Sequence, residues 1–311
     1  LFLSGSSQPS PATLFQFTGI IRHEVQGLPG PIYELSPTAK RTLSTNILTG
    51  AYHYQPGSWK IVTDFSYHAD HQVIQAKANI YPGYEKKYDS ENIHWGLSAS
   101  YFRKHDFQLR GKLETNRAWL NGEDLLIPRF SLNRHQRNSS NVSFSIGRSF
   151  YLPVIVSLFK PHFTINHYNV EYHGSDFTWN GSLSHELELD FLKSTAWFRM
   201  GTAYKLPSFW QMFWVPNAFS EGNPELRPEQ SNDVEGGLRL SLGQISEPWL
   251  SVTAFNQKYH DLISWRRGYG NRYYPVNLQS ATVSGISLST GLNLLKDHIQ
   301  LQATHNITEA V

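Results

Sequence analysis

The sequence lacks cysteine altogether, has only two methionines, and contains no long run of apolar residues. The absence of cysteine excludes a disulfide scaffold and any metal site built from thiolates. With 40% hydrophobic residues and a mean hydropathy of -0.42, the chain offers no segment that could cross a membrane as a helix. Its formal net charge of +2 indicates no nucleic-acid partner. The 14 histidines follow no metal-ligand spacing, so we expect neither a bound metal nor a cofactor.

The chain does contain a two-residue alternation of apolar and polar side chains in nearly every segment. From Trp59 to His68, for example, Trp, Ile, Thr, Phe and Tyr alternate with Lys, Val, Asp, Ser and His. This pattern is typical of antiparallel strands whose two faces meet different surroundings, and it predicts an all-β fold. The alternation assigns one face to Leu109, Leu183, Leu240 and Leu301, and the other to Arg110, Glu186, Arg239 and Gln302.

The lengths of the connections distinguish between two kinds of all-β protein. Short turns are expected at 55–58, 104–106, 152–153, 191–193, 246–248 and 294–297, and long connections at 70–91, 119–135, 206–230 and 262–274. Tight turns on one side and long loops on the other are typical of outer-membrane barrels. Aromatic residues near strand ends, such as Trp59, Tyr101 and Trp249, fit the interfacial girdles of such barrels. We therefore predict an antiparallel transmembrane β-barrel of the outer-membrane type, with a soluble β-sandwich as the alternative.

The most specific motifs lie between positions 200 and 290. Tyr-Lys-Leu-Pro-Ser at 204–208 ends one strand, and Gly-Asn-Pro-Glu-Leu-Arg-Pro-Glu at 222–229 leads into the next. An Asp-Leu-Ile sequence at 261–263 and a spaced Asn-Ala-Gly pattern at 277–285 follow. This order of motifs resembles the TonB-dependent outer-membrane receptors. The positions that match the family's structural motif are Pro207, Asn223, Pro224, Leu226, Pro228, Glu229, Asn277 and Gly285.

The resemblance implies an architecture larger than the chain. Family members join an N-terminal plug domain with a TonB box to a barrel of 22 strands. We expect residues 1–311 to form a partial barrel with about 13 of those strands, and the plug and the C-terminal strands to lie outside the chain. The sequence departs from the family at Lys205-Leu206, where Arg-Ala is usual, and at Ser287, where a glutamate is usual.

The resemblance also implies a function and a location. Receptors of this family take up scarce metal chelates, of the ferric siderophore or cobalamin type, across the bacterial outer membrane. The partners expected from it are the TonB complex, reached through the plug, the outer-membrane lipid and the small-molecule chelate. No hydrolase elbow, phosphate loop or dinucleotide fingerprint occurs, so we do not expect an enzyme. A passive outer-membrane porin is the alternative, although a porin would lack these motifs in series.

Two of the expected extracellular loops hold the candidate ligand-binding residues, which are Trp210, Phe213, Trp214, Trp265, Arg266, Arg267, Tyr269 and Tyr273. Aromatic faces and paired arginines suit an anionic, planar metal chelate. Packing of the loops is the alternative role for the aromatic residues. Haem receptors of the family usually have a histidine between the positions of Pro207 and Asn223, and this sequence has none there. The resemblance therefore favours a siderophore or a corrinoid over haem.

Overall fold

The computed structural model describes residues 1–27, 39–76, 84–103, 106–128, 131–152, 157–214, 220–242, 248–268, 272–278, 280–294 and 299–311. Its main sheet has 15 strands. They are β1 (Phe2–Ser10), β2 (Thr13–Gly27), β3 (Lys40–Tyr54), β4 (Trp59–Ala76), β5 (Tyr84–Arg103), β6 (Phe107–Asp124), β7 (Leu132–Arg148), β8 (Phe150–Leu152), β9 (Ser157–Val170), β10 (Gly174–Glu188), β11 (Leu192–Lys205), β12 (Glu229–Leu242), β13 (Trp249–His260), β16 (Ser280–Leu294) and β17 (Ile299–Ala310). A two-stranded sheet of β14 (Ile263–Arg267) and β15 (Tyr273–Asn277) and one short helix, α1 (Phe209–Phe213), complete the described elements.

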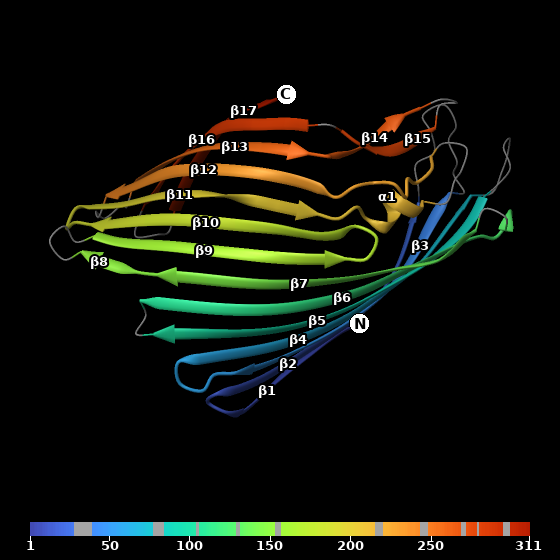
Figure 1. The fold of residues 1–311 in the computed structure, drawn as a ribbon, viewed down its shortest axis with the longest axis horizontal. Coiled ribbons are helices and arrows are strands. Elements are labelled where there is room, and N and C mark those ends of the chain that lie inside the picture. Colours follow the sequence, from blue (N-terminus) through green and yellow to red (C-terminus); the bar gives the residue numbers. More distant parts are fainter. Residues whose placement is uncertain are drawn as a thin grey trace.

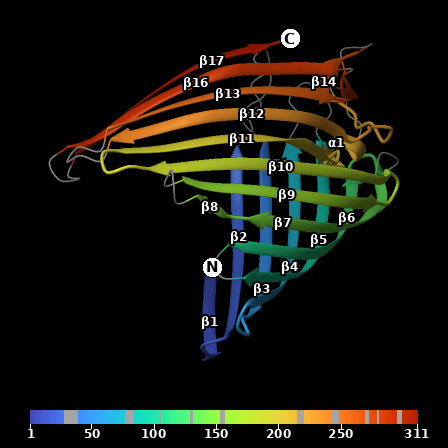
Figure 2. The same ribbon diagram turned by 60° about the vertical axis from the view of Figure 1, so that its left-hand side comes forward.

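The strands follow one another in chain order around an open arc (Figures 1 and 2). Each pairs antiparallel with the strand before and after it, except that the short β8 lies beside β9. In the described part of the chain, β1 and β17 pair on one side only. The all-β antiparallel fold and the partial barrel are confirmed. The sheet has 15 strands where about 13 were expected, and β8, with three residues, is too short for an alternation to be recognised.

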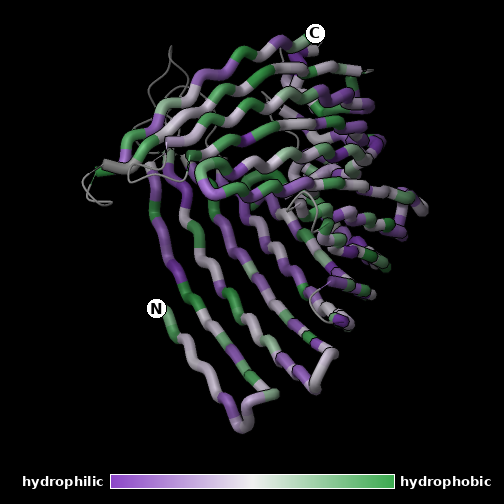
Figure 3. Tube along the Cα trace, turned by 90° about the vertical axis from the view of Figure 1, so that its left-hand side faces the viewer, coloured by the Kyte–Doolittle hydropathy of each residue, from purple (hydrophilic) through white to green (hydrophobic). Residues whose placement is uncertain are grey.

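The apolar side chains line one face of the arc and are not covered by a second layer. Leu183, Leu240 and Leu301 are 44%, 36% and 52% exposed. The register aligns such residues across strands, so that Leu183 lies opposite Phe198 and Leu238 opposite Val252. Figure 3 shows hydrophobic and hydrophilic positions alternating along the strands. Because a soluble sandwich would bury these residues between two sheets, their exposure excludes it and fits a lipid-facing surface.

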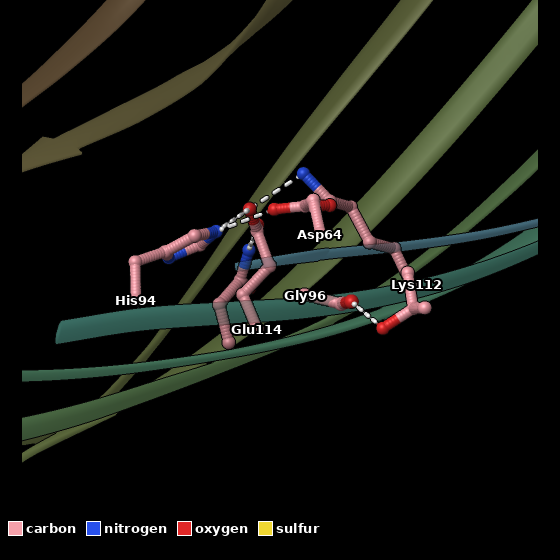
Figure 4. Close-up of polar contacts among 7 residues, drawn as sticks. Asp64, His94, Gly96, Lys112 and Glu114 are labelled. Carbon is pink, nitrogen blue, oxygen red and sulfur yellow. Dashed lines mark hydrogen bonds and ion pairs between the residues drawn. The ribbon is translucent and has the colours of Figure 1, made fainter. Parts of the chain in front are cut away.

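The opposite face of the sheet carries a network of charged side chains (Figure 4). His94 Nε2 lies 3.0 Å from Asp64 Oδ2, and Lys112 Nζ lies 2.5 Å from Glu114 Oε1. Asn141 on β7 donates to Glu114 as well, at 3.2 Å. Gly96 lies within this network, and a Cβ there would come within 2.7 Å of the Asp64 carboxylate. Pairing of charged side chains within and between strands is suited to a wet lumen, where charge need not be buried in lipid.

Several strands are longer than the sequence indicated. β4 and β5 reach Ala76 and Tyr84, and β6 and β7 reach Asp124 and Leu132, so most of the expected connections at 70–91 and 119–135 is strand. The physical reason is that these ends rise beyond the apolar surface. Their outward face carries polar residues such as Asp89 and Glu123, while Tyr88 and Leu120 are buried on the other face. The apolar-outward alternation is therefore lost while the backbone ladder continues. Loop 262–274 likewise contains most of the β14–β15 hairpin.

The expected girdle role of Trp249 is wrong. Its neighbour Leu250 pairs with Leu240 on the apolar face, whereas Trp249 lies on the charged face, opposite Ser241. There the Arg239 guanidinium lies 4.2 Å from the centroid of the Trp249 ring. Trp59 and Tyr101 are opposite each other on the apolar face, as expected, with ring centroids 5.1 Å apart.

A charge placed on the apolar face should be costly, and the same charge on the other face should not. We predict that Leu183→Arg lowers the free energy of unfolding of the full-length protein in lipid vesicles by about 2–4 kcal/mol. Ser184→Arg is the matched control, because Ser184 lies beside Trp197 and Lys160 on the charged face, and it should cost far less. Equal losses in a denaturant titration of the two variants would contradict the assignment of the faces.

Candidate functional site

The connection from β11 to β12 contains the helix α1, which the sequence analysis did not predict. Ser208 caps the helix, since its side chain accepts a hydrogen bond from Gln211 N at 3.2 Å. Gln211 Oε1 in turn accepts from Ser208 N at 2.8 Å. This reciprocal pair is a capping box, and the Ser-x-x-Gln spacing was the signal that could have revealed the helix. Within the helix, Met212 is the buried residue.

The helix packs against the charged face of strands that lie several positions away along the arc. Trp210 and Trp214 contact the Tyr88 ring on β5, with centroids 4.6 Å and 5.9 Å apart. Phe213 stacks on His135 of β7 at 3.8 Å. A connection between β11 and β12 can reach β5 and β7 only by crossing the inside of the arc. The charged face is therefore the concave, lumenal face, and the three candidate aromatics are half-buried packing contacts at its mouth.

The groups beneath the helix are held in neutral form. Burial raises the pKa of the Tyr88 hydroxyl above its ordinary value, and the nearby Asp124 carboxylate adds to the shift. Burial lowers the pKa of His135, which favours a neutral imidazole for stacking on Phe213. Both residues lie beyond the apolar band of their strands. Arg137 fixes the start of the loop, because it donates to the Pro207 carbonyl at 2.7 Å and lies 4.8 Å from the Phe209 ring centroid.

Two asparagines of the sequence motif join the β11–β12 loop to the β14–β15 hairpin. Asn223 donates to the Pro275 carbonyl at 3.0 Å and accepts from Glu225 N at 3.0 Å. Asn277 accepts from Arg227 N at 2.9 Å and donates to the carbonyls of Arg227 and Asp261, at 2.9 and 2.7 Å. We call this set of contacts, formed by Asn223, Arg227, Asp261 and Asn277, the loop clasp.

The remaining motif residues form the base of the same region. Glu229 is buried, pairs with Lys205 at 2.7 Å, and accepts from Ile263 N at 2.7 Å. Leu226 and Pro207 are almost fully buried. Pro224 is exposed and Pro228 half-buried, so both act on the backbone of the loop rather than through burial. Gly285 lies apart from them, on β16. A Cβ at Gly285 would come within 2.5 Å of the Ile307 carbonyl and 2.9 Å of the Phe255 ring.

The β14–β15 hairpin separates the two arginines that the sequence places side by side. Arg267 lies opposite Tyr273, and Arg266 lies opposite Tyr274. Because neighbouring strand residues point to opposite faces, Arg267 shares a face with Trp265 and Tyr273, while Arg266 does not. Arg266, Arg267, Trp265 and Tyr273 are all exposed. The hairpin therefore sets the two guanidinium groups on opposite faces, and the ligand-binding role of these residues stays a prediction. Tyr269 lies outside the described residues.

The hairpin is attached to the loop as well as to the sheet. Tyr273 forms an isolated bridge with Ser220, and Glu221 N donates to its carbonyl at 3.0 Å. Arg272 lies 3.6 Å from Glu221. Figure 1 shows α1, β14 and β15 gathered at one end of the strands. Exposed aromatic and cationic side chains thus project from a hairpin that backbone and side-chain bonds hold in place, which suits binding of an anionic ligand with a flat surface.

Comparison with known proteins relates the sheet that carries this site to a known family. Residues 29–308 match the family model described as TonB dependent receptor-like, beta-barrel. Over 118 residues, 37% of this chain, the sequence is 31% identical to the "Vitamin B12 transporter BtuB" of Vibrio vulnificus, and 17% of that protein is covered. The corresponding protein of Photobacterium profundum is 29% identical over 123 residues, 38% of this chain and 19% of that protein.

Solved structures show the same fold. "Copper transporter OprC" matches 99% of this chain and 52% of its own, with a TM-score of 0.73 at 12% identity. The siderophore receptor PirA from Acinetobacter baumannii matches 99% of this chain and 52% of its own, with a TM-score of 0.64 at 15% identity. The chain therefore spans about half the length of these structures, and its alignments cover less than a fifth of the two curated relatives.

The loop clasp gives a prediction about rigidity. Asn277→Ala removes three hydrogen bonds, each contributing about 1 kcal/mol, without touching the strands that face lipid. We expect backbone amides at 220–228 and 261–268 to exchange with deuterium roughly ten- to hundredfold faster, with the barrel strands unchanged. Asn306→Ala, at an exposed position on β17, is the control. Uniform acceleration across the sheet would show that Asn277 supports the barrel rather than the clasp.

Proposed function

We propose, because this chain belongs to the family of TonB-dependent receptors, that the whole protein takes up a scarce metal chelate across the bacterial outer membrane. The observation that carries the proposal is the family match over residues 29–308. Uptake would draw energy from the TonB complex, reached through a plug domain, as the family resemblance implies. The family consists of receptors and transporters, and its serial motifs favour energised uptake over passive diffusion through a porin.

The class of ligand is inferred from the named relatives and from the sequence of the β11–β12 loop. The curated relatives are named as vitamin B12 transporters, and the structural relatives include siderophore receptors and a copper transporter. The stretch from Pro207 to Asn223 contains no histidine, which disfavours an axial ligand for haem from that loop. These observations together support a corrinoid or a ferric siderophore as the ligand.

We assign the contact with the ligand to the hairpin rather than to the helix. Trp210, Phe213 and Trp214 are engaged with Tyr88 and His135, so their role is to hold the loop across the mouth of the lumen. Trp265, Arg267 and Tyr273 share an exposed face of the β14–β15 hairpin. Two aromatic side chains with a guanidinium between them could stack on a flat chelate and pair with its negative charge.

Uptake by cells tests the proposed function directly. Cells that express the full-length protein should accumulate radiolabelled cobalamin or one of a panel of ferric siderophores, and deletion of the host tonB gene should abolish accumulation. Purified full-length protein should bind the transported compound at equilibrium and should bind haem at least tenfold more weakly. Accumulation that is unchanged without TonB would support a passive channel instead.

The geometry of the hairpin predicts unequal effects for two adjacent arginines. Arg267→Ala should weaken binding of the transported ligand by about 1–3 kcal/mol, the value of a charge-assisted contact. Arg266→Ala serves as the matched control, since it removes the same charge from the opposite face of the same hairpin, and it should change affinity by less than about 0.5 kcal/mol. Equal losses in equilibrium titrations would indicate long-range attraction rather than contact.

A further inference from the structure

The backbone pairing between β10 and β11 ends before either strand does. Its last pair toward the β11–β12 loop is Asn180 with Gly201. Beyond that pair, residues 174–179 of β10 are paired with β9, and residues 202–205 of β11 are paired with β12. We call the place where these two stretches face each other the β10–β11 seam. It lies at the same end of the strands as α1 (Figure 1).

Side chains close the seam where the backbone ladder has ended. Thr202 Oγ1 accepts from Trp179 N at 3.1 Å, and Asp176 Oδ1 accepts from Phe177 N at 2.7 Å. The other oxygen of Asp176, Oδ2, accepts from Gln230 Nε2 on β12 at 2.6 Å. Trp179 and Phe177 are two residues apart, so their amides point to the same edge of β10. Side chains thus satisfy the donors that a continued ladder would use, and opening the seam breaks fewer bonds than opening a paired stretch.

Arg137 links the two sides of the seam. It lies on β7, and β9 and β10 stand between it and β11 in the order of the sheet. Nevertheless, Arg137 donates to the carbonyl of Pro207, two residues beyond the end of β11, at 2.7 Å. Its guanidinium also lies 4.8 Å from the centroid of the Phe209 ring. The start of the β11–β12 loop is therefore held by a side chain from the opposite side of the seam.

His173 lies beside this contact, in the turn between β9 and β10. Its Nε2 atom is buried and has no hydrogen-bond partner among the described residues. Burial lowers the pKa of the His173 imidazole, and the positive charge of Arg137 lowers that pKa further. The closed seam therefore favours a neutral ring.

The carboxylates around the turn are directed to other donors. Glu171 accepts from the backbone N and from Nδ2 of Asn138, at 3.0 and 2.8 Å, and Asp176 accepts from Gln230. Arg137 is therefore the charge that acts on His173. The remaining titratable side chains of the surrounding elements are His135 on β7, Tyr168 on β9, Tyr172 in the turn and Tyr204 on β11.

We infer that the β10–β11 seam is a side gate in the rim of the lumen, and that it opens in acid when His173 takes up a proton beside Arg137. Two positive charges then lie together, and the guanidinium leaves the Pro207 carbonyl. The start of the β11–β12 loop is released and moves away from β10, which widens the mouth on this side. The gate uses none of the hairpin residues proposed to contact the chelate.

The direction of the pH dependence follows from the two states of His173. In the open state the imidazole is hydrated and separated from Arg137, and its pKa returns to about 6.5. The open state then binds a proton more readily than the closed state, so acid favours opening. The closed state is fully favoured above about pH 6.5 and loses stability as the pH falls below that value. Between pH 7.5 and 5.5 this single group can shift the equilibrium by at most about tenfold.

Hydrogen exchange of the full-length protein in lipid nanodiscs, at pH 7.5 and 5.5, tests this inference. Rates are corrected for the intrinsic pH dependence of exchange and expressed as protection factors. The protection of the Trp179 amide and of the amides at 208–213 should be about three- to tenfold lower at pH 5.5. The amides that join β12 to β13 should keep their protection. Equal protection at the two pH values for Trp179 and 208–213 would overturn the inference.

Three variants locate the proton. His173→Gln should abolish the pH response, because glutamine takes up no proton. His162→Gln is the matched control, since His162 lies on the same hairpin opposite Ser182, where β10 is still paired with β11, and it should leave the response intact. His135→Gln should also leave it intact. A response that survives His173→Gln, or one that His135→Gln removes, would contradict the assignment to His173.

A fourth variant tests the role of the second charge and stays informative if His173→Gln does not fold. Arg137→Gln keeps a donor for the Pro207 carbonyl but removes the positive charge beside His173. The response of the Trp179 amide to pH should then fall by at least about half, because proton uptake no longer creates repulsion. A full response in this variant would show that Arg137 does not take part in the gate.

Discussion

The backbone hydrogen bonds between neighbouring strands are the constraint on which the rest of this structure depends. Hydrocarbon provides no partner for an amide or carbonyl, so every strand that crosses it must be bonded along its length. β10 meets this condition over 14 paired residues with β9 and nine with β11. Among the described residues only seven hydrophobic side chains other than proline are buried, so lipid occupies the place that a hydrophobic core takes in a soluble domain.

Side chains on the lumenal face do not have to contact hydrocarbon. They pair with each other and hold the β11–β12 loop and the β14–β15 hairpin in place. Charged residues pair with each other there, both within a strand, such as Lys112 and Glu114 on β6, and between adjacent strands, such as Lys160 on β9 and Glu186 on β10. At the mouth, the helix α1 rests on Tyr88 and His135, and the loop clasp ties Asn223 and Asn277 to the hairpin. The exposed side chains of the hairpin are thereby carried on a fixed support, which would lower the entropy lost on binding of the proposed ligand.

Residues of a single strand contact different surroundings. On β6, Lys112 and Glu114 face the lumen, Leu109 and Leu113 face the lipid, and Arg117 with Trp119 lie on the outward face beyond these apolar residues. The alternation of side chains separates the lumen-facing from the lipid-facing residues, and position along the strand separates the lipid-facing residues from Arg117 and Trp119. The proposed contact with a chelate and the contact with lipid therefore lie on different faces of the same sheet.

The sequence by itself determined that the strands are antiparallel, which residues lie on the apolar and on the polar face of the sheet, and which family the chain resembles. These features follow from neighbouring residues, since Leu183 and Ser184 must point to opposite sides of any strand that contains both. The motif positions Asn223 and Asn277 were also recognisable, although not the bonds between them. Only the tertiary structure decided which side chains meet across the mouth. Trp210 and Phe213 looked like ligand contacts until the loop was seen to cross to β5 and β7, and Arg266 and Arg267 looked like a pair until the hairpin set them on opposite faces. Strand ends at 70–91 and 119–135 escaped detection because their outward face carries polar residues and their lumenal face packs beneath the β11–β12 loop, which removes the alternation that marks a strand in lipid.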